Sequence, residues 1–228
     1  MITDIIVIKY NVPILEKECI KSILEFTNGQ ETPYHLTIYD NYPKDEALSV
    51  IWNRLIAKSE ADYICLLNSD TQVEQNWLKK MLEVFQKEVN IGLVGPTSNR
   101  VGGQQGRIKT SKEYAVSDIK YICGLCMIFP KSIWEKVRGF NERFFFTGED
   151  NFFSWQVQKM GFRSVVRHDI FIFHHWHGSY REAQKRRGRS IRRFDARESE
   201  RIFRELTNGA KNPDGRPSDI NLNQFPKL

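Results

Sequence analysis

The sequence predicts an α/β fold with a mainly parallel central sheet and helices on both of its faces. Short apolar runs of strand length alternate with longer segments that have helical apolar spacing. The chain has 228 residues, which is enough to bury a substantial core. It contains no apolar run near the ~18 residues of a membrane-spanning helix, so we expect it to fold in water.

The expected elements follow from local patterns of apolar and turn-forming residues. Apolar runs predict strands at residues 5–9, 36–39, 63–67, 92–95, 121–129 and 164–173. Spacings of three and four predict helices at residues 13–26, 46–58, 77–86, 132–137 and 149–160. Pro13 stands in the first turn of the first helix, and Asn76 at the N-cap of the third. Residues 97–118 lack a periodic pattern and predict a mobile loop.

An acidic residue, Asp70, follows the predicted strand that begins at Tyr63. Ligands of open α/β sheets bind just outside the carboxyl ends of strands. A carboxylate in that place suits a hard cation bound to a phosphate-bearing substrate. The alternative is a cap for the helix near Trp77.

Two adjacent carboxylates, Glu149 and Asp150, follow Gly148 at the start of a predicted helix. The helix dipole favours acidic residues there and explains their charge. It does not explain the flanking aromatic residues, which are Phe144, Phe145, Phe146, Phe152, Phe153 and Trp155. Aromatic walls either raise a carboxylate pKa or pack as core, and both interpretations stay open.

Three of the five histidines, His174, His175 and His177, lie together after an apolar run. Neutral imidazole is a common metal ligand, so the group favours a metal or phosphate role. Side chains alternate along a strand, so His174 and His175 point to opposite faces and only one should reach a shared metal. A carboxylate with an added histidine favours Mn²⁺ over Mg²⁺.

These motifs, in this order, resemble the family 2 glycosyltransferases, specifically a bacterial rhamnosyltransferase-like group. The resemblance runs from about Ile5 to Ser179. Five motifs carry it: Ile5–Asn11, Asp40-Asn41, Leu67–Thr71 for Asp-x-Asp, Gly139–Asp150 for GGFDERFF…GED, and Phe173–Ser179 for His-His-x-x-Gly-Ser. Each motif alone is weak, but five in order are specific.

The chain departs from the family pattern at three positions. Lys9 replaces a small hydroxyl residue, Asn68 the first Asp of Asp-x-Asp, and Arg138 the first Gly of Gly-Gly-Phe. Asn68 keeps a neutral oxygen but removes one negative charge. We therefore expect weaker metal affinity rather than loss of metal use.

The resemblance implies a GT-A fold and a metal-dependent glycosyltransferase for a hexosyl or deoxyhexosyl group. The sugar would pass from a nucleotide-diphosphate donor to a hydroxyl of a glycan or lipid-linked acceptor, with inversion, in polysaccharide biosynthesis. Asp150 would be the general base, with Glu149 as the alternative. Mn²⁺ or Mg²⁺ would bind Asp70 and one of His174, His175 and His177. The donor nucleotide would lie at Tyr10, Asn11, Asp40, Asn41, Asn68 and Ser69.

Two other classes of protein are weighed against this interpretation. A sugar-nucleotide nucleotidyltransferase usually has a Gly-rich basic loop after the first strand, and residues 10–15 contain no Gly. A non-catalytic nucleic-acid-binding protein would spread a basic, aromatic face across the fold. Here the basic excess is confined to one segment, so we expect no nucleic-acid partner.

The C-terminal part differs in composition, and we divide the chain into residues 1–180, 181–207 and 208–228. The second part is a basic helical extension, and the third, with three prolines, is expected to be extended or disordered. Arg181–Arg204 holds ten basic residues against five acidic ones counted through Glu205, and this excess of about five nearly accounts for the net charge of +6. They indicate either a salt-bridged helix that docks through apolar residues or a surface for anionic lipid, a phosphorylated acceptor or the donor diphosphate. The apolar residues are Ile191, Phe194, Ile202, Phe203 and Leu206.

The four cysteines and the N-terminus bear on location. Cys123 and Cys126 form a C-x-x-C inside a predicted strand, which argues against a redox or zinc site. The lack of a disulfide framework favours a reducing compartment. Residues 1–4 do not resemble a signal peptide. We expect a cytoplasmic protein, with peripheral contact at the inner face of the membrane through the basic segment as an open alternative.

Overall fold

The computed structural model describes residues 1–102, 105, 110–145, 147–175, 178, 181–182, 185 and 191–210, with the backbone alone at 191–195. The strands are β1 (Thr3–Lys9), β2 (Tyr34–Asp40), β3 (Tyr63–Asn68), β4 (Thr71–Gln72), β5 (Ile91–Ser98), β6 (Val116–Asp118), β7 (Cys126–Pro130) and β8 (Arg163–His174). The helices are α1 (Pro13–Phe26), α2 (Leu48–Lys58), α3 (Trp77–Lys87), α4 (Lys131–Val137), α5 (Glu149–Lys159) and α7 (Ile191–Leu206).

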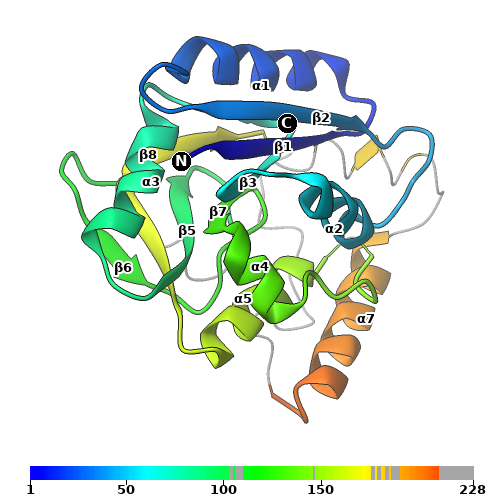
Figure 1. Cartoon of the computed structure of the whole chain (residues 1–228). Coiled ribbons are helices and arrows are strands. Elements are labelled where there is room, and N and C mark those ends of the chain that lie inside the picture. Colours follow the sequence, from blue (N-terminus) through cyan, green and yellow to red (C-terminus); the bar gives the residue numbers. More distant parts are fainter. Residues whose placement is uncertain are drawn as a thin grey trace.

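The strands form one mixed, mostly parallel sheet between two layers of helices (Figure 1). The strand order is β2-β1-β3-β7-β5-β8-β4, and β6 pairs with β8. The longest registers are parallel and join β1 to β2, β1 to β3, and β5 to β8. The short strands β4, β6 and β7 pair antiparallel with their neighbours. The predicted α/β class is confirmed.

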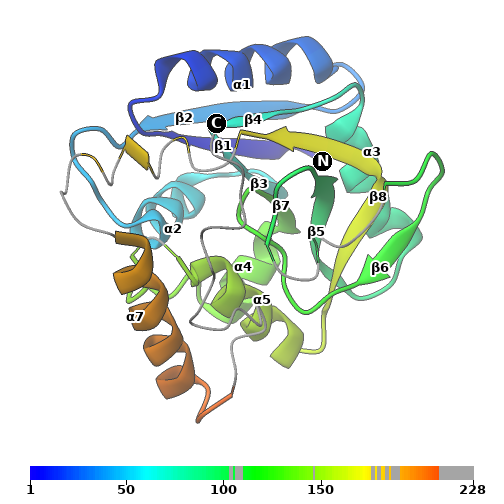
Figure 2. The ribbon, with the colours of Figure 1, turned by 180° about the vertical axis from the view of Figure 1, so that it is seen from behind.

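Alternation along β1 directs its side chains into two cores. Ile5 and Val7 pack on the side of α1 and α3, and Ile6 packs on the side of α2, α4 and α5. All three are fully buried, and each buried aliphatic side chain contributes about 1.5–3 kcal/mol. The view from behind shows the same two layers on either side of the sheet (Figure 2).

The predicted strand at residues 121–129 is only partly a strand, because β7 begins at Cys126. In the residues just before β7, the backbone N–H groups donate to side chains instead of to a neighbouring strand. The Ile122 N–H donates to Ser154 Oγ, and the Cys123 N–H donates to Gln105 Oε1. The Gly124 N–H donates to a carboxylate of α5, which is Asp150. Residues 121–125 therefore form a turn, with its backbone donors directed at side chains.

Two further expectations differ from the structure. The strand predicted at residues 92–95 is the longer β5, and β6 lies inside the predicted loop 97–118. Both strands pair with β8, and this pairing supplies order that no local pattern shows. Asn76 stands at the N-cap of α3 as predicted, but its side chain makes no capping hydrogen bond. Its backbone has a φ of 60° instead.

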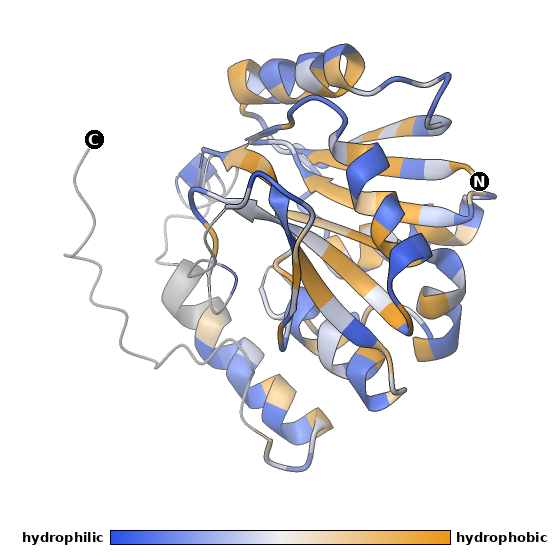
Figure 3. Ribbon diagram, turned by 90° about the vertical axis from the view of Figure 1, so that its left-hand side faces the viewer, coloured by the Kyte–Doolittle hydropathy of each residue, from blue (hydrophilic) through white to orange (hydrophobic). Residues whose placement is uncertain are grey.

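The C-terminal helix α7 packs on a third, smaller core. Ile202 and Phe203 are buried against Phe144 and Phe152, and Leu206 lies at the edge of this group. The exposed side carries ion pairs, among them Arg204 with Glu200 at 2.7 Å. Hydropathy alternates along α7, whereas apolar residues dominate the inner strands (Figure 3). In the part of the chain described, no helix combines the length and apolar character needed to cross a membrane.

Candidate functional site

The candidate residues gather where β1, β2 and β3 end. These neighbouring strands run parallel, so their carboxyl ends meet at one edge of the sheet. Tyr10 follows β1, Asn41 follows β2, and Asp70 lies just beyond β3. The strand β8 reaches the same edge through its pairing with β4, where Thr71 lies opposite His174.

Asp70 and His174 form a buried pair at this edge. The Asp70 Oδ1 atom lies 3.3 Å from His174 Nε2, and the two residues are 4% and 7% exposed. The Gly178 N–H donates to the other carboxylate oxygen, Oδ2, at 3.0 Å. A Cβ on Gly178 would lie 2.7 Å from Leu15 Cδ1 and 3.4 Å from Asp70 Oδ2, so any larger residue would require the Leu15 side chain to shift.

A backbone carbonyl fixes the orientation of the His174 ring. His174 Nδ1 lies 2.8 Å from the carbonyl oxygen of Arg100. A carbonyl only accepts hydrogen bonds, so Nδ1 carries a hydrogen. Nε2 then presents either a lone pair or a second proton to the Asp70 carboxylate. A second proton makes a direct ion pair with Asp70, whereas a lone pair that faces the carboxylate would be satisfied by a cation bound to both. An N–H bonded to a carbonyl is also the usual support of a metal-binding histidine.

Opposing effects set the ionisation of Asp70. Burial by itself raises the pKa of this carboxyl group, but the contact with His174 and the Gly178 amide lower it. The net result is a pKa below the usual value. Asp70 is therefore an anion at neutral pH and can act as a cation ligand.

His175 points to the other face of the strand, as alternation predicts. Its Nε2 atom lies 3.6 Å from Glu18 Oε2 and 3.3 Å from Gln72 Nε2. Its backbone N–H donates to the carbonyl of Asp70 at 2.9 Å. The backbone of His175 thus supports the position of Asp70, while its ring contacts Glu18 and Gln72. His177 lies outside the described residues.

The donor set fits a divalent cation in part. Asp70 and His174 offer one carboxylate and one imidazole, which suit Mn²⁺. Among the described residues there is no group of three or more His, Cys, Asp or Glu side chains that could hold a metal. A cation held by this pair would need further ligands, such as phosphate oxygens and water.

Asp150 lies close to this edge through a short chain of backbone contacts. Its Oδ2 accepts the Gly124 N–H at 2.8 Å, and its Oδ1 accepts the Asn151 N–H at 2.8 Å. The next residue, Leu125, accepts the Asn68 N–H at 2.9 Å. The end of β3 and the start of α5 therefore meet on the turn at residues 121–125.

Glu149 differs from Asp150 in exposure. Glu149 is 5% exposed, whereas Asp150 is only partly buried. Both stand in the first turn of α5, after Gly148 with a φ of 92°. The helix dipole therefore stabilises both carboxylates, but an acceptor molecule reaches Asp150 more readily.

The predicted nucleotide residues fall into two groups. Asn41 is 1% exposed, and its amide bonds both the N–H and the carbonyl of Glu46, so it holds the loop after β2. Asp40 is open, with a side chain that is 58% exposed and an ion pair to Lys9 Nζ at 3.5 Å. This loop also receives the Tyr10 hydroxyl, which donates to Asp45 at 2.8 Å.

The other residues predicted to bind the nucleotide are Asn11, Asn68 and Ser69. Asn11 adopts a φ of 53° and its Nδ2 donates to Glu182 at 3.0 Å. Asn68 ends β3. The Ser69 hydroxyl is buried and has no hydrogen-bond partner among the described residues. A buried hydroxyl of this kind is suited to a polar ligand.

Several contributors to this arrangement were not predicted from the sequence. The Arg100 carbonyl, Gln105 and the Gly124 amide act through hydrogen bonds between distant segments. Gly124 interrupts an apolar run, and an isolated glycine in such a run signals close backbone approach. The other two carry no sequence signal.

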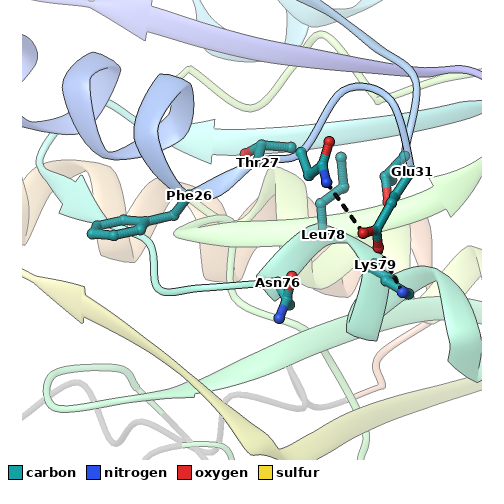
Figure 4. Close-up of a pocket in the computed structure, with 8 residues that line it drawn as sticks. Phe26, Thr27, Glu31, Asn76, Leu78 and Lys79 are labelled. Carbon is teal, nitrogen blue, oxygen red and sulfur yellow. Dashed lines mark hydrogen bonds and ion pairs between the residues drawn. The ribbon is translucent and has the colours of Figure 1, made fainter.

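A hollow elsewhere in the molecule contains none of these residues. It is a shallow surface depression between the end of α1 and the start of α3. Figure 4 shows its lining, with Lys79 and Glu31 paired at 2.7 Å and Leu78 at its base. It therefore offers no alternative to the candidate site at the ends of β1, β2 and β3.

Solved structures share the fold at low sequence identity. GalNAc-T7 with UDP, GalNAc and Mn²⁺ aligns with a TM-score of 0.62 and 10% identity over 75% of this chain and 42% of its own. Drosophila β1,4-galactosyltransferase 7 with xylobiose gives 0.54 and 11% over 72% and 64%. S. aureus TarS 1-349 gives 0.57 and 14% over 91% and 71%. The chain thus spans less than two thirds of the first two.

The sequence comparison identifies the family. No curated protein matches the chain at a significant level. Residues 43–170, more than half of the chain, match the family described as glycosyl transferase family 2. These residues include β3, Asp70, α5 and most of β8. The chain belongs to glycosyl transferase family 2.

Proposed function

We propose that this glycosyltransferase uses a divalent cation, held by Asp70 and His174, to bind a nucleotide-diphosphate sugar. The observation that carries the proposal is the buried Asp70–His174 pair, with His174 Nδ1 bonded to the Arg100 carbonyl. When bound, Mn²⁺ or Mg²⁺ would offset the charge that builds on the leaving diphosphate. GalNAc-T7, which has the same fold, was solved with UDP and Mn²⁺, and this supports the choice of ligand.

The donor nucleotide would lie along the ends of β1 and β2. Asp40 offers an exposed carboxylate to the base or ribose, and the Tyr10 and Tyr42 rings meet edge to face at 6.0 Å. Tyr42 is 40% exposed, so its ring is available to a flat partner. Ser69 offers its buried hydroxyl closer to Asp70.

The sugar would be transferred by direct displacement with inversion, and Asp150 would take the proton from the acceptor hydroxyl. Two backbone N–H groups orient its carboxylate, one from Gly124 and one from Asn151. A positioned base of this kind contributes about 10²–10⁴ in rate. The transferred group is proposed to be hexosyl or deoxyhexosyl, as in a rhamnosyltransferase-like enzyme, and the acceptor a glycan or lipid-linked hydroxyl of polysaccharide biosynthesis.

We also propose a location for the enzyme and a division of the chain into three parts. We place the enzyme in the cytoplasm, with its basic segment at the inner face of the membrane. The catalytic unit is taken as residues 1–180, followed by the extension 181–207 and the tail 208–228. The family match lies entirely within the first of these parts.

The test compares the two neighbouring histidines. Thermal shifts of the wild type, Asp70→Ala, His174→Ala and His175→Ala are measured with UDP, GDP and dTDP, each with and without Mn²⁺. A ligand at a hundredfold excess over Kd stabilises the fold by about 2.7 kcal/mol. We expect this Mn²⁺-dependent gain to disappear in Asp70→Ala and His174→Ala and to persist in His175→Ala. Loss in His175→Ala with retention in His174→Ala would contradict the assignment.

A further inference from the structure

We propose that Ser199 of the C-terminal helix α7 is a positioning residue for Asp150. The inference rests on the proposed role of Asp150 as the base. It extends the catalytic unit beyond residues 43–170, which match the family, to a helix about fifty residues downstream of the acidic pair.

Ser199 and Thr147 form a reciprocal pair. Ser199 is 7% exposed, and its hydroxyl donates to the Thr147 carbonyl oxygen. The two hydroxyl oxygens lie 2.9 Å apart. Since the single hydroxyl hydrogen of Ser199 goes to the carbonyl, the Thr147 hydroxyl is the donor of the second bond. Both the backbone and the side chain of Thr147 are thereby held by one residue of α7.

The pair lies directly against the turn that starts α5. Gly148 follows Thr147 with a φ of 92°, a conformation that favours glycine. A Cβ on Gly148 would lie 3.0 Å from Ser199 Cβ and 3.0 Å from Phe144 Cδ1. No space is left between this turn and α7, so a shift of α7 moves the start of α5.

Asp150 stands only three residues after Thr147. Its Oδ2 is bonded to the Gly124 N–H on the opposite side of the turn. Other contacts also attach α7 to this region, since Phe203 packs edge to face on Phe152 at 5.9 Å and Arg143 pairs with Glu205. Apolar packing alone tolerates small shifts, whereas a satisfied buried polar pair specifies one arrangement.

The first measurement follows the Gly124 amide by hydrogen exchange in the full-length protein. Exchange of this amide requires its bond to Asp150 to open, and Gly124 lies outside the α7 contact. Ser199→Ala removes both hydrogen bonds of the pair. Loss of one typical hydrogen bond changes an equilibrium by about three- to tenfold, so exchange should speed by at least that factor. Thr147→Ser, which keeps both hydrogen bonds of the pair and adds no atom, should leave exchange within about twofold of the wild type.

A matched control removes a hydroxyl that lies just beyond the C-terminal end of α7. The Thr207 hydroxyl donates to the Phe203 and Ala210 carbonyls, so its hydrogen bonds are local to that end of the helix. Thr207→Val should leave Gly124 exchange within about twofold of the wild type, even if its melting temperature falls. Thr147→Val removes only the second bond of the pair, and it serves if Ser199→Ala fails to fold.

The second measurement is a double-mutant cycle of transfer rates. The donor is the member of a UDP-, GDP- and dTDP-sugar panel that the wild type turns over. We expect Ser199→Ala to lower kcat by about 10- to 100-fold, the range that a small misplacement of a reacting group costs, with donor KM within about twofold. In the Asp150→Asn background the same change should have little further effect, because both act through one group.

Different results would overturn the positioning role of Ser199 and the role of Asp150 as the base. Unchanged Gly124 exchange in Ser199→Ala, or additive rate losses in the cycle, would overturn the positioning role. Full transfer activity in Asp150→Asn would instead remove Asp150 as the base, whatever the exchange data show.

Discussion

At the scale of single residues, the two adjacent carboxylates of α5 differ in what they can do. Glu149 is buried beneath the turn, whereas Asp150 is partly open and its carboxylate is oriented by the Gly124 amide. Their charge does not distinguish their roles, since the helix dipole stabilises both carboxylates. Access and orientation favour Asp150 as the base.

The residue-scale prediction for Asp150→Asn is a loss of rate without a loss of fold. The two side chains are nearly isosteric, and the dipole-favoured charge contributes only about 0.3–1 kcal/mol. Transfer should fall by about 10²–10⁴, while donor affinity stays close to the wild type. Rate and melting temperature are measured together. Glu149→Gln is the matched control, and a larger rate loss there would move the role by one residue.

Glu46, in the loop after β2, makes the stability of the fold depend on pH. Hydrogen bonds from Arg54 and then from Tyr39 lower the pKa of this carboxyl group to about 2. The folded pKa lies below the unfolded value of about 4.3. Glu46 therefore stabilises the fold above that pH, and this stability is lost as the pH falls toward 2.

Melting temperatures between pH 6 and pH 2.5 check this. The wild type should exceed Glu46→Gln at pH 6, and the difference should shrink steadily below pH ~4.3. Glu60→Gln, at an exposed position, serves as the control. A difference between wild type and Glu46→Gln that stays constant down to pH 2.5 would show that this carboxylate is not held by Arg54.

At the scale of elements, the order of strands and helices follows from the sequence, but their partners do not. The parallel ends of β1 and β3 could be predicted, because both are continuous apolar runs that stop at polar residues. The turn at residues 121–125 could not, because Gln105, Ser154 and Asp150 supply its hydrogen bonds from distant segments.

The same reason limits prediction at the candidate site. Alternation shows that only one of His174 and His175 can face Asp70, but not which one. The choice depends on the register in which Thr71 meets His174, set by the pairing of β4 with β8. The C-terminal helix is a similar case. Its apolar face could be predicted from the sequence, whereas its contact with Gly148 could not.

Gly178 lies against Leu15 of α1 and Asp70 at the end of β3, and its substitution tests this packing. A Cβ here would press on Leu15 of α1 and on the Asp70 carboxylate after β3. We expect Gly178→Ala to destabilise the fold by about 1–3 kcal/mol through overpacking, and to weaken Mn²⁺-dependent UDP binding through displacement of Asp70. Gly161→Ala is the control, since no atom lies within 4 Å of its added Cβ, although its φ of 85° adds strain. Equal effects of both variants on UDP binding would argue against a role for this packing.

At the scale of the whole molecule, the net charge of +6 is unevenly distributed. The helix α7 has five basic and four acidic residues, and its described arginines Arg201 and Arg204 pair with glutamates. Residues 181–190 have five basic residues and one acidic residue. The positive excess therefore lies before α7, and α7 itself is close to balanced.

This distribution predicts which residues bind an anionic surface. Substitution of Lys185, Arg186, Arg187 and Arg189 by Gln should reduce binding to phosphatidylserine vesicles, with about 1 kcal/mol lost per charge near the surface. The melting temperature should stay within a few degrees of the wild type. Substitution of Arg201 and Arg204 by Gln is the control and should leave vesicle binding unchanged. A stronger loss in that control would place the anionic surface on α7.

The pairing of β4 with β8 has a consequence during synthesis. Asp70 and His174 are separated by 103 intervening residues and are joined by a two-residue ladder. A nascent chain that has emerged only to the end of the family match can pair β1 with β2 and β3, yet it has no His174 to complete the candidate ligand pair. Gly178, which closes over Asp70, arrives later still. The part of the sheet made of β1, β2 and β3 would therefore form before the proposed cation ligands Asp70 and His174 are both present.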